Sequence, residues 1–231
     1  MGTVLAFLQA RMGSTRLPGK VLLRIQGKTL LEHAVWRLRA ARTLAGVMIL
    51  TTTLEEDNQI AAEGGRLGTP VHRGPELDVL RRYQQASERF GPGIIVRATA
   101  DNPLIDIGSV DRIVCALRSG KFDYCMESGL PVGAATEAIT AGALLRSDQD
   151  AREDRHREHV TLYAKEHPEK FRLAFLEPPG TLRNPGLRLT VDTPEDFVLV
   201  EELIRALPES TEPHPLERYL DFATRITRAW C

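Results

Sequence analysis

The chain has 231 residues, and its 30 lysine and arginine residues are balanced by 31 aspartate and glutamate residues, which gives a formal net charge of −1. This balance excludes the broad positive field of a general nucleic-acid binder, so an anion-binding site would have to be local. With 42% hydrophobic residues and no apolar run near the roughly 20 residues that a membrane helix needs, the composition is typical of a globular protein and disfavours membrane insertion.

The length fits one α/β domain, which we expect to span residues 1–231. The three cysteines are odd in number and form no Cys-x-x-Cys pair, which disfavours a disulfide framework and a zinc cage and favours reduced thiols. The apolar start of the chain is too short for a secretory signal, because Gln9 and Arg11 follow it. We therefore expect a cytoplasmic protein.

Short apolar runs, interpreted as buried strands, alternate along the chain with longer stretches of helical periodicity. The strands are predicted at Val4–Leu8, Val47–Leu50, around Val71, at Ile94–Val96 and at Leu187–Val191. The helices are predicted at Leu30–Leu44, Glu55–Glu63, Val79–Phe90, Val110–Leu117, Pro194–Leu207 and Pro215–Trp230. This alternation predicts an α/β fold with a mixed, mostly parallel sheet and helices on both faces. Residues 121–185 are less regular, and we interpret them as an insertion or lid built onto the same sheet.

The most informative segment is the loop Gln9–Lys20, directly after the first predicted strand. It carries Arg11, Arg16 and Lys20 and no acid, in a chain that is otherwise neutral. Its glycine and hydroxyl residues let backbone N–H groups turn inward while the cations stay on the rim, which is the arrangement that a polyphosphate needs. A phosphate site is therefore favoured over a basic surface turn.

Two familiar nucleotide-binding motifs do not fit this loop. In the NTPase phosphate loop, four residues separate the glycines and a serine or threonine follows the lysine. Here five residues separate Gly13 from Gly19, and Val21 follows Lys20. The dinucleotide pattern Gly-x-Gly-x-x-Gly is absent from this turn as well, so a dehydrogenase loses its main support.

Two aspartates follow predicted strands further along the chain. Asp101 comes at the carboxyl end of the strand that begins at Ile94, and Asp192 comes after Leu187–Val191. Carboxylates placed there can hold a hard cation such as magnesium beside substrate phosphates. The alternative is that they only begin helices, which suits Asp106, Glu195 and Asp196 better than it suits these two.

Five blocks of sequence, in chain order, resemble one enzyme family. The blocks are Gln9–Leu22, Arg73–Tyr83, Arg97–Asp106, Arg157–Thr161 and Val191–Asp196. They resemble the sugar cytidylyltransferases: the spore coat polysaccharide biosynthesis protein F family first, and more distantly the CMP-Kdo synthetases and the acylneuraminate cytidylyltransferases. The resemblance covers most of the chain. It implies a single GT-A-like, Rossmann-like nucleotidyltransferase domain, CTP as substrate, Mg²⁺ or Mn²⁺ as cofactor, and a homodimer as a possible assembly.

The resemblance also assigns individual residues. It places the nucleotide on Gln9, Arg11, Gly13, Ser14, Arg16, Lys20, Thr51, Thr52 and Arg73. It places the metal ion on Asp101 and Asp192, and the acceptor sugar under residues 121–185, with Glu137 and His159 as candidate contacts. Two departures from the family pattern affect these sites. The chain has Ala100-Asp101-Asn102-Pro103 at the metal block, and an aspartate expected before Glu137 is missing, which leaves the acceptor undetermined.

The reaction implied is attack of a sugar oxygen on the α-phosphorus of CTP with release of pyrophosphate, and we expect the product to be a CMP-sugar for surface polysaccharide. Lys20 and Arg11, with Arg16, would neutralise the leaving group, and Asp101 would act through the metal ion. We expect Lys20 to be an exposed cation, so that its replacement by alanine lowers turnover and leaves folding nearly unchanged.

Two other functions remain open at this stage. A GT-A-type glycosyltransferase, which consumes a nucleotide-sugar, would be favoured if the Asp148-Gln149-Asp150 segment held the metal ion, although a solvated helix end is the simpler interpretation of that segment. A nucleotide-binding relative without catalysis is suggested by the two departures. Formation of product from CTP separates these functions.

Overall fold

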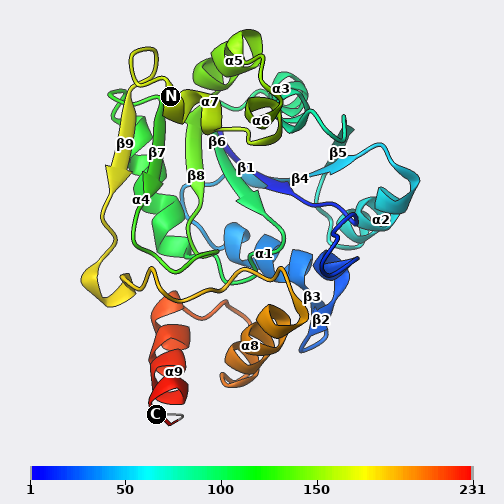
Figure 1. Cartoon of the computed structure of the whole chain (residues 1–231), viewed down its shortest axis with the longest axis vertical. Helices are drawn as coiled ribbons and strands as arrows, with labels where there is room; N and C mark the ends of the chain where they lie inside the picture. Colours follow the sequence, from blue (N-terminus) through cyan, green and yellow to red (C-terminus); the bar gives the residue numbers. More distant parts are fainter. Residues whose placement is uncertain (1, 230–231) are drawn as a thin grey trace.

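The structure is a computed structural model that describes residues 2–229, with side chains up to residue 225. Seven strands form its main sheet, in the order β5-β4-β1-β6-β8-β7-β9 (Figure 1). Their bounds are β1 Val4–Gln9, β4 Gly46–Thr52, β5 Val71–Gly74, β6 Ile94–Thr99, β7 Tyr124–Glu127, β8 Glu137–Thr140 and β9 Leu173–Leu176. A separate two-stranded hairpin joins β2, Arg24–Ile25, to β3, Lys28–Thr29.

The sheet is mixed and mostly parallel, as predicted. Strand β1 pairs in parallel with β4 and with β6, and β4 pairs in parallel with β5. Strand β8 is antiparallel to both of its neighbours, β6 and β7. In the register, Gln9 lies opposite Leu50 on one side and Thr99 on the other, so the carboxyl ends of β1, β4 and β6 meet at one edge. The loops that follow these strands are thereby brought together.

Helices cover both faces of the sheet, because the side chains of β1 alternate between two buried clusters. Ala6 and Leu8 pack toward α1 and α4, whereas Leu5 and Phe7 pack toward α3, α5 and α7. The bounds are α1 Leu30–Arg39, α2 Asn58–Arg66, α3 Val79–Phe90, α4 Ile107–Arg118, α5 Ala141–Asp150, α6 Asp154–Glu158 and α7 Leu162–Glu166. Figure 1 shows α3, α5, α6 and α7 gathered on one side of the sheet.

The last two helices, α8 Pro194–Arg205 and α9 Leu216–Ala229, enclose a third buried cluster. They lie at the opposite end of the molecule from α5 (Figure 1). Helix α8 begins with a capping box. The hydroxyl of Thr193 accepts from the N–H of Asp196, and the carboxylate of Asp196 accepts from the N–H of Thr193. The predicted last helix extended to Trp230, which lies outside the described residues. None of the helices described is long and apolar enough to cross a membrane.

One predicted strand is wrong. Residues Leu187–Val191 are extended, but they form only an isolated bridge, between Arg188 and Val132, and they do not join the sheet. Leu189 and Val191 are fully buried because they pack in the cluster formed with α8 and α9. Their alternating pattern therefore reflects packing against helices and does not reflect strand pairing.

Three strands of the main sheet were missed, and all lie within residues 121–185; the short hairpin of β2 and β3 was not predicted either. Strands β7, β8 and β9 have four residues each and extend the sheet beyond β6. Two of them carry a buried acid: Glu127 on β7 pairs with Arg112, and Glu137 on β8 pairs with Arg97. These charges interrupt the apolar pattern by which short strands are recognised. The segment was interpreted as built onto the sheet, and the structure makes it part of the sheet.

Candidate active site

The loop that follows β1 forms one wall of a cavity of about 240 Å³ at the carboxyl edge of the sheet. Its tight turns are held by its own backbone, since the N–H groups of Ser14 and Gly19 both donate to the carbonyl of Met12, at 2.9 and 3.1 Å. Gly19 has φ +68°, a left-handed conformation that residues with a Cβ rarely adopt. The chain then enters a short 3-10 turn, Lys20–Leu22. This geometry aims Lys20 back toward the sheet.

Lys20 lies between the two predicted metal-binding aspartates. Its Nζ is 2.8 Å from Oδ2 of Asp101 and 2.7 Å from Oδ1 of Asp192. The two aspartates are 91 residues apart in the sequence (101 and 192), and the structure brings them to one cation. Lys20 is only 7% exposed, so the prediction of an exposed loop cation is wrong. Its two carboxylate partners account for the burial, because a buried ammonium must be paired.

Asp192 is held by further contacts. Its Oδ2 pairs with Arg188 and lies 3.3 Å from Arg16, and its N–H donates to Asp196. Burial by itself would raise the pKa of Asp192, but Lys20 and Arg16 lower it below its usual value. The neighbouring N–H of Val191 donates to the carbonyl of Asp101 at 2.9 Å, which joins the segments that carry the two aspartates.

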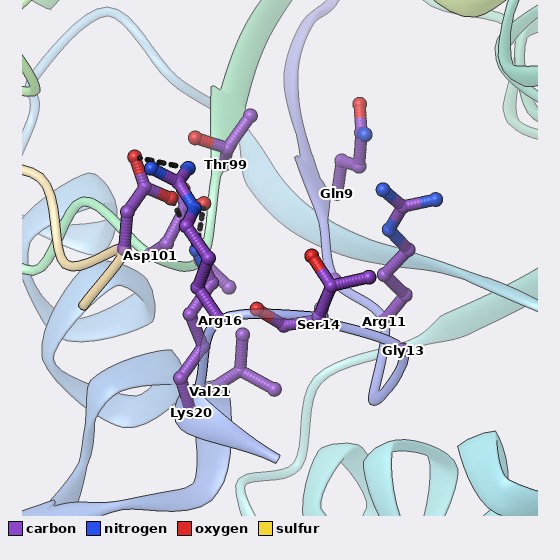
Figure 2. Close-up of a pocket in the computed structure, with 13 residues that line it drawn as sticks. Gln9, Arg11, Gly13, Ser14, Arg16, Lys20, Val21, Thr99 and Asp101 are labelled. Carbon is purple, nitrogen blue, oxygen red and sulfur yellow. Dashed lines mark hydrogen bonds and ion pairs between the residues drawn. The ribbon is translucent and has the colours of Figure 1, made fainter. Parts of the chain in front are cut away.

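Figure 2 shows how the loop divides its cations. Arg16 and Lys20 lie on the side of Asp101, whereas Arg11 lies on the opposite side of the loop, beyond Ser14 and Gly13. The side chain of Gln9 projects from the end of β1 near Thr99 of β6. Of the nine predicted nucleotide-binding residues, six line this cavity: Gln9, Arg11, Gly13, Ser14, Arg16 and Lys20.

The carboxylates of Asp101 and Asp192 are suited to a divalent ion. Two carboxylates already converge on one positive charge, and carboxylate oxygen is what Mg²⁺ and Mn²⁺ prefer. Over residues 2–229 there is no group of three or more His, Cys, Asp or Glu side chains placed to hold a metal ion. A site with two protein carboxylates still fits Mg²⁺, which usually keeps waters and binds substrate phosphates at its remaining positions.

Three predicted nucleotide contacts lie elsewhere. Thr51 and Thr52 are 0% and 1% exposed, and neither lines the cavity. The Arg73 guanidinium donates to the carbonyls of Thr52 and Leu54, both at 2.8 Å, and to Oδ1 of Asn58 at 2.6 Å. The contacts of Arg73 therefore hold the turn after β4.

Asp57, which the sequence analysis missed, links the turn after β4 to the loop Gln9–Lys20. Asp57 is fully buried, and its Oδ1 accepts from the N–H of Met12 at 2.7 Å. Its Oδ2 accepts from both the N–H and the hydroxyl of Thr52. In the sequence, Asp57 is only an acid near the start of a helix. Such acids are common in surface helices, so the sequence does not indicate that Asp57 is buried. Asp57 thereby fixes the position of the loop Gln9–Lys20.

A second cavity, of about 510 Å³, shares Gln9 and Arg11 with the first. One wall is the turn before α3, where Leu77 is 79% exposed, an unusual degree for a leucine that faces a cavity. The opposite wall is α6 with the adjoining His159, and Arg97 of β6 completes the lining. The shared residues make the two cavities adjoining parts of one binding region.

Glu137, predicted as an acceptor contact, lines neither of the two cavities. It is 8% exposed, and its carboxylate is fully used inside the protein. Oε2 accepts from Arg97 at 2.7 Å, and Oε1 accepts from Tyr124, Thr161 and Lys165. Burial would raise the pKa of Glu137, but Arg97 and Lys165 lower it to about 2. The role of Glu137 as an acceptor contact stays a prediction, and in the structure its carboxylate supports Arg97, which lines the second cavity.

His159 does line the second cavity, as an exposed side chain. The aspartates of the alternative Asp-x-Asp segment line neither cavity. Asp148 is ion-paired with Arg81 and Arg157, at 2.9 and 2.7 Å, and Asp150 pairs with Lys170 at 3.1 Å. Because neither carboxylate faces a cavity that could hold a nucleotide, this segment gives no support to a metal-dependent glycosyltransferase.

Known proteins are similar to this chain in sequence and in fold. A sequence model of the family described as Cytidylyltransferase matches residues 5–223. The chain is 37% identical over 233 residues to the spore coat polysaccharide biosynthesis protein SpsF of Bacillus subtilis, covering 99% of this chain and 95% of that one. A cytidylyltransferase structure from Leptospira borgpetersenii has a TM-score of 0.84 at 29% identity, covering 98% and 94%. A CMP:2-keto-3-deoxy-manno-octonic acid synthetase complexed with CTP has a TM-score of 0.69 at 17% identity, covering 88% and 99%, and shares the fold.

Proposed function

Because this chain belongs to the cytidylyltransferase family, we propose that it transfers the CMP part of CTP to a hydroxyl group of a sugar or sugar acid and releases pyrophosphate. The observation that carries the proposal is the first cavity, where a glycine-containing loop with three cations faces two converging aspartates. A site of this kind suits a triphosphate bound with a divalent ion. The name of the Bacillus subtilis relative supports a role in making surface polysaccharide.

The residues of the first cavity divide the work of the transfer. Backbone N–H groups of the loop, with Arg16 and Lys20, would bind the β- and γ-phosphates and neutralise the pyrophosphate as it leaves. Asp101 and Asp192 would hold Mg²⁺ or Mn²⁺, which when bound supplies positive charge at the α-phosphate. The acceptor oxygen then attacks the α-phosphorus, opposite the bond to the leaving pyrophosphate, and loses its proton to solvent.

The starting positions of the side chains imply an exchange of partners. Without ligands, Lys20 and Arg16 neutralise the two aspartates themselves. When a triphosphate and a divalent ion bind together, the cations of the loop can pass to the phosphates while the aspartates pass to the metal ion. Each ligand thus frees groups that the other needs, so CTP and Mg²⁺ are expected to bind cooperatively.

The second cavity is proposed as the place for the acceptor. It adjoins the first through Gln9 and Arg11, so a sugar bound there lies next to the phosphates. Its lining offers hydrogen-bonding groups of both kinds, including Arg97 and His159. Such mixed donors and acceptors suit the hydroxyl groups of a sugar.

The proposal is tested by measuring pyrophosphate release. The protein is incubated with Mg²⁺ and each of CTP, UTP, GTP and ATP, against a panel of sugar acids and sugar phosphates. The expected result is release with CTP and at least one panel sugar, with a CMP-sugar formed in equal amount. Failure of every combination, together with no thermal stabilisation by CTP and Mg²⁺, would overturn the proposal. NAD serves as the negative control in the thermal assay.

A further inference from the structure

The segment Arg157–Thr161, which joins α6 to α7, has an unusual arrangement of contacts. The side chains of Arg157 and Thr161 form hydrogen bonds with different parts of the protein. The side chain of Val160 is fully buried. Arg157, Glu158 and His159 line the second cavity, and of these Glu158 and His159 are exposed. Five consecutive residues thus combine two attachment points with one surface that faces the proposed acceptor.

The first attachment is the guanidinium of Arg157. It donates to both carboxylate oxygens of Asp78, at 2.9 and 2.8 Å, in the paired geometry that gives arginine its directionality. It also donates to the carbonyl of Asp148 at 2.9 Å and to its Oδ1 at 2.7 Å. Asp78 caps α3, accepting from the N–H of Arg81. Arg157 therefore has its donors committed to the protein, and it ties α6 to α3 and α5.

The second attachment is the hydroxyl of Thr161, which is 2% exposed and donates to Oε1 of Glu137 at 2.9 Å. Glu137 is fixed in turn by Arg97, Tyr124 and Lys165. This network is anchored in the sheet, since Glu137 lies on β8 and Arg97 lies opposite it on β6. The two attachments thus join the segment to a helix pair on one side and to the sheet on the other.

The backbone of His159 is also held on both sides. Its N–H donates to the carbonyl of Arg155 at 2.9 Å, and its carbonyl accepts from the N–H of Leu162 at 2.7 Å. By contrast, its imidazole makes no hydrogen bond or ion pair with any residue that the structure describes. An imidazole without a partner, on a backbone held by two hydrogen bonds, is placed to bind a ligand with little loss of conformational entropy.

We propose that residues 157–161 form a two-point mount that holds the imidazole of His159 at the wall of the acceptor cavity, so that Arg157 and Thr161 act on the acceptor through His159. The imidazole binds a hydroxyl group of the acceptor sugar, because it can both donate and accept a hydrogen bond. Arg157 and Thr161 are positioning residues. The identity of the ligand rests on the proposed function, whereas the mount itself does not.

The mount is tested first without substrate, by NMR relaxation of the backbone amide of His159. We expect an order parameter near the rigid value of about 0.85 in the unmodified protein, and below about 0.6 in Arg157→Gln and in Thr161→Val. Thr161→Ser keeps the hydroxyl and should restore the rigid value. Arg155→Gln is the matched control, because Arg155 lies on the same helix and pairs only with Glu153 and Glu166 near the surface. The amides of His33 and His72 report whether a variant has lost its fold.

The second test is a double-mutant cycle, with CTP and the panel sugar that gives the fastest pyrophosphate release. His159→Ala should raise KM for the sugar by about 10-fold, as expected for one hydrogen bond lost, and change KM for CTP by less than about 2-fold. Arg157→Lys should raise KM for the sugar in the unmodified background and have no effect in the His159→Ala background.

Two results would overturn the mount: an unchanged order parameter of His159 in both Arg157→Gln and Thr161→Val, or additive effects in the cycle. If no panel sugar releases pyrophosphate and CTP with Mg²⁺ gives no thermal stabilisation, the proposed function fails, and the relaxation measurement still decides whether the mount exists. If the sugar reacts but His159→Ala leaves its KM unchanged, the proposed function stands and the role of His159 is wrong.

Discussion

Replacing Lys20 by methionine removes one charge from the centre of the first cavity and keeps a side chain of similar length. In the unmodified protein, this charge neutralises Asp101 and Asp192 at 2.8 and 2.7 Å. Its loss leaves two carboxylates facing each other. We therefore expect the variant to be less stable in the absence of divalent ions, and to regain stability when Mg²⁺ takes the vacated position.

The contacts set the size of this effect. Removal of one partner from a fully buried ion pair typically costs about 3–5 kcal/mol. Here the side chains of Asp101 and Asp192 keep 26% and 21% exposure, and Asp192 retains Arg16 and Arg188. We accordingly expect a loss of about 2 kcal/mol in the free energy of unfolding, or a fall in Tm of roughly 4–8 °C for a domain of this size. Mg²⁺ at about 100 times its Kd would return roughly 2.7 kcal/mol.

The assay is thermal and urea unfolding with EDTA and with increasing Mg²⁺. Lys170→Met is the matched control, because Lys170 pairs with Asp150 at the surface, where solvent screens the pair and it contributes little to stability. The unmodified protein should respond weakly to Mg²⁺ alone, since Lys20 competes for the aspartates. Equal stability of Lys20→Met and the unmodified protein in EDTA would refute the reasoning, and so would a variant that remains insensitive to Mg²⁺.

Three further predictions concern neighbouring acids. Asp101→Asn and Asp192→Asn should each abolish most turnover and raise the Mg²⁺ concentration for half-maximal activity, and the double variant should be little worse than the worse single one; an unchanged half-saturation in Asp192→Asn would leave Asp101 as the only protein ligand. Asp57→Ala should lower stability by about 1–3 kcal/mol and weaken stabilisation by CTP, because the buried N–H groups of Met12 and Thr52 lose their acceptors; normal CTP binding would separate Asp57 from the loop. Folding lowers the pKa of Glu137 from 4.5 to about 2, so ionised Glu137 should add roughly 3 kcal/mol to the free energy of unfolding above pH 4.5. This contribution should be lost as the pH falls toward 2, and Glu137→Gln should make the free energy of unfolding less dependent on pH in that range.

The sequence was sufficient to place the loop Gln9–Lys20 near Asp101. The loop Gln9–Lys20 and Asp101 each follow a strand with strong apolar character, and parallel strands put their carboxyl ends at one edge of a sheet. Local chemistry determined these positions, because strand patterns, turn residues and helix caps act over a few residues. The cap at Thr193 is one such signal, and the structure contains it.

Tertiary structure alone decided how the charges are paired. No local pattern shows that Lys20 is buried between Asp101 and Asp192, that Asp57 holds the N–H of Met12, or that Glu137 is enclosed by four donors. Ion pairs of this kind join residues that are tens of positions apart, so their existence depends on the fold as a whole. The sequence specifies which charged groups are available, and packing decides which of them remain free for a ligand.

The same limit explains the elements that were predicted wrongly. Leu187–Val191 has the alternation of a strand, but helices α8 and α9 bury its apolar side chains instead of a neighbouring strand. Strands β7 and β8 lack a clear apolar pattern because Glu127 and Glu137 lie within them, and arginines on α4 and β6 neutralise these acids only after folding. An apolar pattern reports that a side chain is buried, whereas the partner that buries it is set by the arrangement of distant segments.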